Sequence, residues 1–168
     1  MAMDMEFKFD LNSYLEHSDA PVKSLAQILD SGRFHPRLEK RFRRSENAEK
    51  NSDEYLGRLA RRDELAQLLL ETMTAHNLDA LVYPTLRVKP NFVGEDQSGS
   101  LCHIAAHSGM PAISLPAGFT PDGVPVGVEL LARPFEEGRL IELGYAWEKL
   151  ADPRRSPPLT PSLLPAPG

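Results

Sequence analysis

The sequence predicts an α/β fold in which part of a mixed β-sheet is flanked by helices. Three short apolar stretches, residues 79–84, 111–119 and 124–131, have the length and composition of buried strands. Residues 53–76 and 136–151 carry apolar side chains at helical spacing. Strands that are apolar on both faces need cover above and below. We therefore expect the complete sheet to contain more strands than this chain supplies.

The first third of the chain predicts helices. Residues 10–16 predict a short helix, and residues 21–31 predict a second one, with proline at its start and glycine just past its end. Residues 33–51 are polar and include the basic run HPRLEKRFRR. We interpret this run as a solvated helix face or loop. The alternative is an anion-binding patch, which neighbouring acids such as Glu39 would weaken.

Residues 53–76 are the longest helix candidate. Ser52 is a suitable N-cap, and Asp53 and Glu54 complement the positive end of the helix dipole. Asn77 is an acceptable residue for a left-handed end. An apolar stripe runs along one side, which predicts a helix packed on a core.

The second half predicts strands around a helical turn. The strand at 79–84 ends at a proline, residues 85–103 resemble a loop, and residues 104–108 predict one turn of helix. Residues 111–119 and 124–131 predict an antiparallel hairpin, because the connecting sequence TPDG is strong turn chemistry.

The chain then continues into a helix and a tail. Residues 136–151 predict the last helix, and Asp152-Pro153 ends it. Residues 152–168 predict an extended proline-rich tail.

Composition places the protein among ordinary globular chains. Its 168 residues include 19 Lys and Arg against 24 Asp and Glu, which gives a net charge of −5. This balance argues against a general nucleic-acid binder, and no apolar run predicts a membrane partner. One cysteine cannot form a disulfide within the chain, and the N-terminus does not resemble a signal peptide. We expect a cytoplasmic protein.

Cysteine and histidine offer candidate chemistry near residue 102. His103 and His107 are four residues apart and would share a helix face, but zinc needs at least a third ligand. Cys102 lies on another face, and neither HExxH nor CxxC occurs, so we predict no metal site. We expect Cys102 to be a buried free thiol. The alternative is a cysteine nucleophile with a nearby histidine as base.

Other catalytic patterns do not emerge from the residues alone. The sequence contains no GxSxG, no phosphate-binding loop and no GxGxxG. Ser98-Gly99-Ser100 is explained by a plain loop, and Glu136 with Glu137 by a helix start. On these grounds the chain is a small-molecule-binding surface or a packing module.

A longer motif changes this interpretation. Residues 108–135, SGMPAISLPAGFTPDGVPVGVELLARPF, closely resemble the C-terminal part of the amidase signature family. DALVYPT at 79–85, DLNSYL at 10–15 and PVKSLAQIL at 21–29 are similar to further segments of that family, as is the terminal RRSPPLTP. The resemblance covers roughly residues 6–161 and implies the C-terminal part of an amidase-signature fold.

The resemblance also implies a chemistry whose central residues are missing from this chain. In the family, a serine attacks an amide carbonyl, and a second serine in a cis peptide relays its proton to a lysine. Those residues lie in the N-terminal half of family members, and nothing here matches them. We therefore assign no catalytic residue, no substrate-binding residue and no cofactor.

One position departs from the family pattern and another follows it. Gly99-Ser100-Leu101-Cys102 stands where related amidases often show Gly-Ser-Asn-Cys, so Leu101 removes an amide side chain. Arg133 stands where the family has the arginine of GRPF, and we expect it to make a structural ion pair.

These observations lead to three hypotheses. Residues 1–151 form the C-terminal part of an amidase-like domain and 152–168 a tail, so the chain is inactive alone or one part of a split or truncated amidase. Its partner would be the N-terminal amidase half, and an amide substrate would bind only once the core is complete. Alternatively, the chain is a non-catalytic module that dimerises or binds a partner through its open sheet. The third hypothesis places a new catalytic site around Cys102, His103 and His107.

Overall fold

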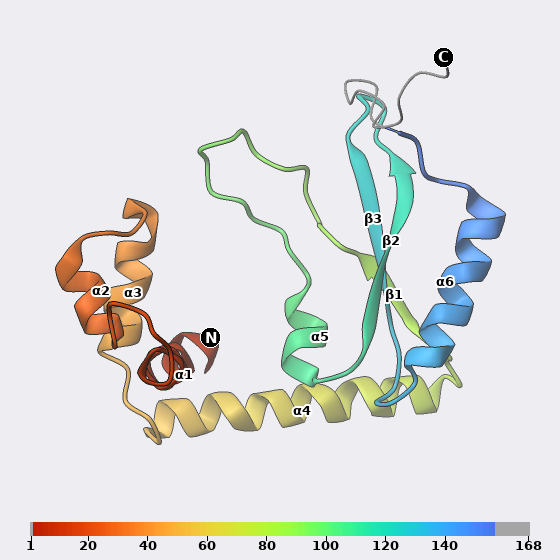
Figure 1. Ribbon diagram of the computed structural model, residues 1–168. Helices are drawn as coiled ribbons and strands as arrows, with labels where there is room; N and C mark the ends of the chain where they lie inside the picture. The colour runs from red at the N-terminus through yellow and green to blue at the C-terminus, as the bar shows by residue number, and fades with distance from the viewer. Residues whose placement is uncertain (1, 157–168) are drawn as a thin grey trace, which may run out of the picture. The chain divides into compact units, whose positions relative to one another are not determined.

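A computed structural model describes residues 2–156 of the chain, which form two compact units. The units divide within one long helix, between Glu64 and Leu65. In chain order the elements are α1 (Ala2–Glu16), α2 (Leu25–Ser31), a 3₁₀ turn η1 (Pro36–Leu38), α3 (Glu39–Glu46), α4 (Asp53–Ala75), β1 (Leu81–Pro84), α5 (His103–Ser108), β2 (Ala112–Phe119), β3 (Pro125–Leu131) and α6 (Glu137–Ala151) (Figure 1). Most of the predicted tail lies outside the described residues.

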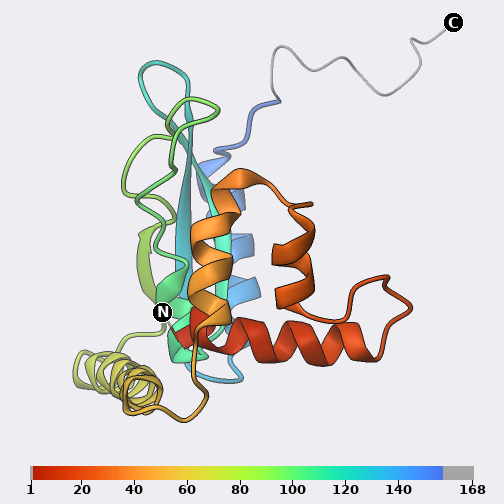
Figure 2. The same cartoon turned by 90° about the vertical axis from the view of Figure 1, so that its left-hand side faces the viewer.

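Helix α1 begins well before the predicted start at residue 10. Its first turns are held by side chains from a distant segment: Arg41 of α3 donates to Asp4 at 2.9 Å, and Phe7 stacks on Phe42 with ring centroids 5.7 Å apart. The local sequence therefore predicts too short a helix, because long-range contacts stabilise its first turns. Figure 2 shows α1 beside α2 and α3 in the N-terminal unit.

Helix α2 begins four residues later than predicted. The Ser24 side chain accepts a hydrogen bond from the Gln27 N–H and caps the helix, and Leu25 is fully buried at its first position. The predicted glycine end is confirmed, since Gly32 is left-handed with φ +61° and its N–H bonds to the Leu29 carbonyl. Within residues 33–51, η1 and α3 form the solvated helical segment that the sequence indicates.

Helix α4 confirms its predicted ends. The Ser52 hydroxyl accepts from the Tyr55 N–H at 3.3 Å, which satisfies a donor of the first turn. Asn77 has φ +50°, and the Leu78 N–H bonds back to the Met73 carbonyl at 2.8 Å. The two caps therefore delimit a helix of 23 residues.

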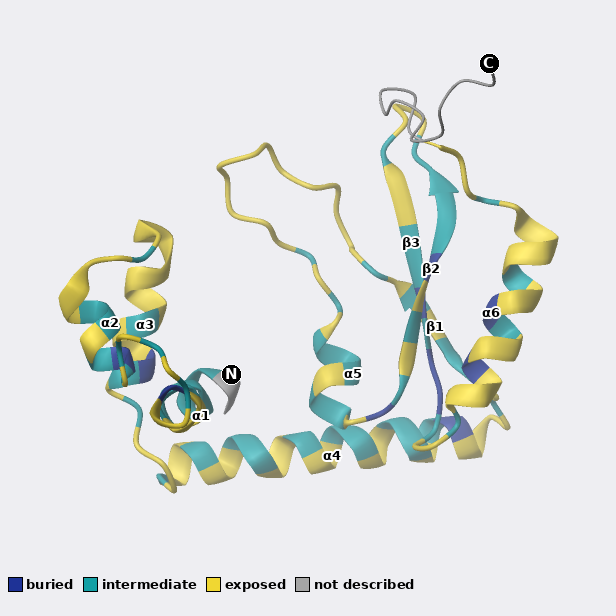
Figure 3. Cartoon of the chain, viewed as in Figure 1, coloured by how far each residue is buried: buried dark blue, intermediate teal, exposed yellow. Residues whose placement is uncertain are grey.

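The C-terminal unit packs around a small core at the end of α4. Met73, Met110 and Leu131 are the buried members of this cluster. Figure 3 shows buried segments of the ribbon near the end of α4 and at the end of β3. Partly buried apolar residues surround the three buried ones: Leu69, Leu70, Leu78, Leu81, Tyr83, Ile104 and Ala105. Segments from α4, β1, α5 and β3 therefore share one apolar centre.

The described sheet has three strands in the order β1-β3-β2, and both pairings are antiparallel. This confirms the α/β class and the predicted hairpin, and it places β1 on the far side of β3. Leu81 pairs with Leu131, which in turn pairs with Ala112. Within residues 2–156, the outer edges of β1 and β2 have no neighbouring strand.

The hairpin turn also follows the prediction. The Gly123 N–H bonds to the Thr120 carbonyl at 2.9 Å, and the Thr120 N–H bonds to the Val124 carbonyl at the same distance. Gly123 has φ +86°, a conformation that costs glycine little. A register shift between Pro116 and Gly118 bends β2 before this turn.

Helix α6 covers one face of the sheet. Gly144 lies so close to β2 that a Cβ there would meet the Leu115 and Ile113 side chains at 3.4 and 3.5 Å. The Trp147 indole N–H donates to the Pro116 carbonyl at 2.8 Å. The predicted last helix is thus confirmed. No helix among residues 2–156 is both long and apolar enough to span a membrane.

We expect Leu131→Ala to destabilise the chain by about 2–5 kcal/mol, because the substitution leaves a cavity beside Met73 and Met110. Chemical denaturation followed by circular dichroism measures this change in the free energy of unfolding. Leu150→Ala is the matched control, since that side chain is 88% exposed, and its effect should stay within about 0.5 kcal/mol. Equal effects of the two substitutions would contradict the assigned core.

Candidate functional site

A polar row crosses the sheet face opposite α6. Tyr83, Glu129 and Ser114 are register partners on β1, β3 and β2, so their side chains share one face. The neighbouring pair Ile113 and Leu130 lies on the other face, where α6 packs. We call Tyr83, Glu129, Ser114 and the adjoining Thr85 the polar row.

Glu129 is the central and most buried member of the polar row. Its side chain accepts a hydrogen bond from the Tyr83 hydroxyl at 2.7 Å, and the residue is only 6% exposed. A buried carboxylate is costly unless it is hydrogen-bonded. Burial raises the pKa of Tyr83, and its hydrogen bond to the Glu129 carboxylate raises it further. Tyr83 therefore remains a protonated donor at neutral pH.

Thr85 and Ser114 extend the polar row beyond this pair. Their hydroxyl oxygens are 2.9 Å apart and hydrogen-bonded, and the Thr85 N–H bonds to the Gly127 carbonyl at 3.0 Å. A Cβ on Gly127 would meet the Thr85 Oγ1 at 2.8 Å, so this close approach requires glycine. The row therefore presents two neighbouring hydroxyls, which can each donate or accept.

The loop that follows β1 is closed at its base. The Arg87 N–H bonds to the Gly99 carbonyl at 2.9 Å, the Leu101 N–H bonds to the Thr85 carbonyl at 3.2 Å, and Leu86 and Ser100 form an isolated bridge. We call this pairing of residues 85–87 with 99–101 the clip. Gly99 has φ +84°, and a Cβ there would approach the Val88 side chain to 2.6 Å. Ser98-Gly99-Ser100 thus serves loop geometry, as predicted.

Cys102 is exposed, so the expected buried thiol is wrong. The short helix α5 turns Ile104 and Ala105 toward the core, which leaves the residue before the helix on the solvent side. The Ser100 hydroxyl donates to the Cys102 sulfur at 3.1 Å, and His103 Nδ1 lies 4.0 Å from that sulfur. The thiol therefore sits in a polar surface environment.

His103 and His107 share a helix face, as their spacing predicts. Their rings meet edge to face with centroids 5.7 Å apart. Among residues 2–156, no group of three His, Cys, Asp or Glu side chains is arranged to hold a metal ion. Leu101, in the position where related amidases often have asparagine, is half-buried.

Arg133 has the structural role that the sequence indicates. Its Nη1 donates to the Leu78 carbonyl at 2.9 Å and lies 4.0 Å from the Glu136 carboxylate. It thereby links the end of β3 to the segment that follows α4. Glu137 lies in the first turn of α6, where a negative charge complements the helix dipole.

Lys89 and Asp122 connect the loop to the hairpin turn. The Lys89 Nζ lies 2.6 Å from the Asp122 Oδ1, and the Thr120 hydroxyl donates to the same oxygen at 2.6 Å. These hydrogen bonds, the one from Lys89 first, lower the pKa of Asp122 to about 2. Both side chains are exposed, so the ion pair contributes little to the free energy of unfolding. Its main effect is to hold the loop near the hairpin turn.

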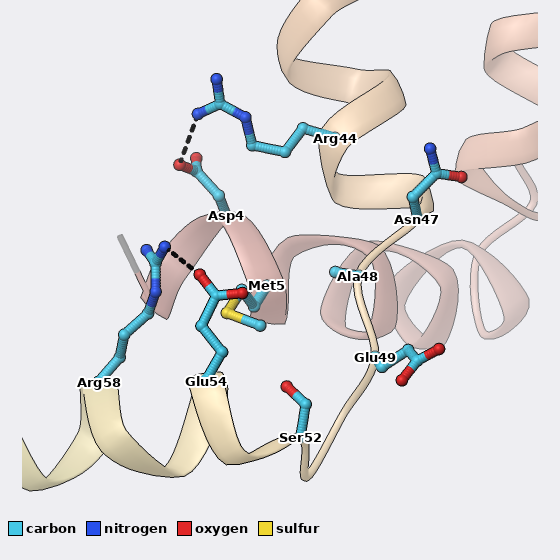
Figure 4. A pocket seen from close by; sticks show the side chains of 9 residues that line it. All are labelled: Asp4, Met5, Arg44, Asn47, Ala48, Glu49, Ser52, Glu54 and Arg58. Atoms are coloured by element: carbon cyan, nitrogen blue, oxygen red, sulfur yellow. Dashed lines mark hydrogen bonds and ion pairs between the residues drawn. The ribbon is translucent and has the colours of Figure 1, made fainter.

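The N-terminal unit contains a separate hollow of about 430 Å³ (Figure 4). Charged side chains around it pair with one another: Arg44 lies 3.9 Å from Asp4, and Arg58 bonds to Glu54. In the basic run, Arg43 also pairs with Glu39 at 2.8 Å. These pairings favour the solvated-helix interpretation of residues 35–44 over an anion-binding patch.

Comparison with known proteins identifies the family. The Amidase family model matches residues 5–141, and the chain therefore belongs to the amidase family. A probable amidase of Arabidopsis thaliana is 31% identical over 166 residues, which cover 94% of this chain and 30% of that protein. A glutamyl-tRNA(Gln) amidotransferase subunit from Myxococcus xanthus is 37% identical over 100 residues, covering 52% of this chain and 20% of that protein.

Solved structures agree with this assignment. The native peptide amidase of Stenotrophomonas maltophilia matches with a TM-score of 0.74 and 27% identity, over 92% of this chain and 33% of that one. An amidase family protein of Bacillus anthracis matches with a TM-score of 0.74 and 28% identity, over 93% of this chain and 30% of that one. The chain thus spans a fifth to a third of the length of these relatives.

Replacing Tyr83 with Phe should destabilise the chain by about 1–3 kcal/mol, because it removes the donor that satisfies the buried Glu129 carboxylate. Equilibrium denaturation at neutral pH measures the loss. Tyr145→Phe is the control, since Tyr145 is 64% exposed on α6, and little change is expected. An unchanged free energy of unfolding in Tyr83→Phe would show that this hydrogen bond does not offset the cost of burying Glu129.

The Lys89–Asp122 pair should give an unusual carboxyl titration. A pKa of about 2 leaves Asp122 about 90% ionised at pH 3, whereas its ordinary value of 3.8 would leave it mostly protonated. The stabilisation from the Lys89–Asp122 ion pair is therefore fully present above pH 3.8 and is lost as the pH falls through about 2. Side-chain carboxyl NMR should show this, with Lys89→Gln raising the Asp122 pKa and Lys149→Gln leaving it unchanged. An unshifted titration in the native chain would refute the pairing.

Proposed function

We propose that this chain supplies the C-terminal portion of an amidase that hydrolyses carboxylic amides to an acid and ammonia or an amine. The observation that carries the proposal is the family match over residues 5–141. The likeness to a peptide amidase supports it, because that likeness extends over 92% of the chain.

In this proposal the nucleophile, the relay serine and the lysine come from the N-terminal portion characteristic of the family. No segment of the 168 residues matches that portion. Removing members of such a catalytic set costs several orders of magnitude in rate. The chain by itself is therefore expected to be inactive by the family mechanism.

The contribution of this chain is a wall of the acyl or leaving-group pocket. The polar row offers the Thr85 and Ser114 hydroxyls on a sheet face that α6 does not cover. Glu129 and Tyr83 are hydrogen-bonded to each other, which holds that face in register, and the raised pKa of Tyr83 keeps its hydroxyl protonated at neutral pH. These residues orient and bind; they perform no bond cleavage.

We also propose an organisation and a location for the protein. Residues 1–151 are the amidase-like portion and 152–168 a tail. The completing N-terminal portion belongs either to the same polypeptide or to a second chain, and the assembly is placed in the cytoplasm. One relative is by its name a subunit of an amidotransferase. This supports the alternative in which a second chain supplies the N-terminal portion.

A complementation assay tests the proposal. The chain alone should release no ammonia or amine from aryl or aliphatic amides, whereas mixing with the polypeptide encoded directly upstream should produce hydrolysis and a complex on size exclusion. The control is that upstream polypeptide with its nucleophilic serine replaced by alanine, which should bind but not hydrolyse. Hydrolysis by the chain alone, or neither activity nor a complex on mixing, would overturn the split-enzyme version.

The unpaired sheet edges favour a second candidate, a non-catalytic module that dimerises or binds a partner strand. In the described part of the chain, β1 and β2 present their outer edges without a neighbour. Light scattering at increasing concentration should then show a dimer. A stable monomer with high thermal stability would count against this candidate.

A further inference from the structure

A second pocket adjoins the polar row, on the side of the loop that follows β1. Its volume is about 330 Å³, and its lining includes Thr85, Arg87, Lys89, Ser114, Thr120 and Val124. The lining combines two cationic side chains, three hydroxyls and an apolar wall, and it includes no acidic residue. Such a mixture suits a small ligand that has an anionic end and an apolar body.

The backbone of this pocket is fixed on two sides. The Thr85 N–H bonds to the Gly127 carbonyl on β3, and the clip bonds the Arg87 N–H to the Gly99 carbonyl at 2.9 Å. The base of the Arg87 side chain is therefore held by main-chain hydrogen bonds to both the sheet and the returning strand of the loop. A ligand would meet a preformed backbone rather than order a free loop.

The two cations of the pocket differ in availability. Lys89 is paired with Asp122 at 2.6 Å. Arg87 is exposed, and among residues 2–156 its guanidinium makes no hydrogen bond or ion pair. A guanidinium presents a planar fork of donors that matches a carboxylate in two parallel hydrogen bonds. The hydroxyls of the lining and Lys89 have hydrogen-bond partners. The Arg87 guanidinium, by contrast, has hydrogen-bond donors available for a ligand.

We propose that this pocket binds a small carboxylate with an apolar body, with Arg87 taking the carboxylate and Val124 and Pro125 contacting the body. One open guanidinium matches one carboxylate better than a phosphate dianion, which would require more positive charge. If the chain serves an amidase, its preferred substrates carry a free carboxylate besides the amide; this extension alone rests on the proposed function.

Direct binding to the full chain tests the pocket without any hydrolysis, so its failure is distinguishable from failure of the amidase proposal. Benzoate should shift the NMR signals of Arg87 and of the pocket residues. The neutral isostere benzamide should bind about tenfold more weakly, because it loses the charge-assisted pair. Inorganic phosphate should compete poorly.

Variants locate the site. Arg87→Gln should weaken benzoate binding about tenfold, and Arg87→Lys should recover part of it, because a point charge lacks the fork. Arg61→Gln is the matched control, since Arg61 is also an exposed arginine, and it should bind as the native chain does. Overlaid NMR spectra confirm that each variant is folded. Equal binding of benzamide and benzoate, strong competition by phosphate, no benzoate binding, or unaltered binding by Arg87→Gln would each overturn the proposal.

Discussion

The C-terminal unit depends on the position of β3 between two antiparallel neighbours. Leu131 at its end is fully buried and contacts the cluster that contains Met73 and Met110. Two residues earlier, Glu129 lies on the same face and is satisfied by Tyr83. One strand therefore carries both the apolar core and the polar row, so burial of Leu131 also sets the register that brings Tyr83, Glu129 and Ser114 together.

Local signals account for the parts of the fold that the sequence predicts well. The TPDG turn, the serine cap of α4 and the spacing of apolar residues in α6 act within a few residues, and the structure contains each of them. The start of α1 could not be predicted in this way. Its first turns are stabilised by Asp4 and Phe7 through residues more than thirty positions away.

The candidate site shows the same limit more clearly. Cys102 and the nearby histidines are prominent in the sequence because their side chains are reactive, but the thiol is exposed where burial was expected. The polar row was missed because its members come from three strands whose register is not readable from spacing alone. One signal was present: Glu129 interrupts an otherwise apolar strand, and a lone acid there indicates a partner across the sheet.

The clip at the base of the loop has a consequence for chain entropy. Pairing residues 85–87 with 99–101 shortens the segment whose ends must be held together, from the whole connection between β1 and α5 to residues 88–98. The closure entropy of that segment grows only slowly with its length. Insertions or deletions near Phe92 and Val93, both exposed, would therefore change the reach of the loop while the strands and the polar row beneath it stay in place.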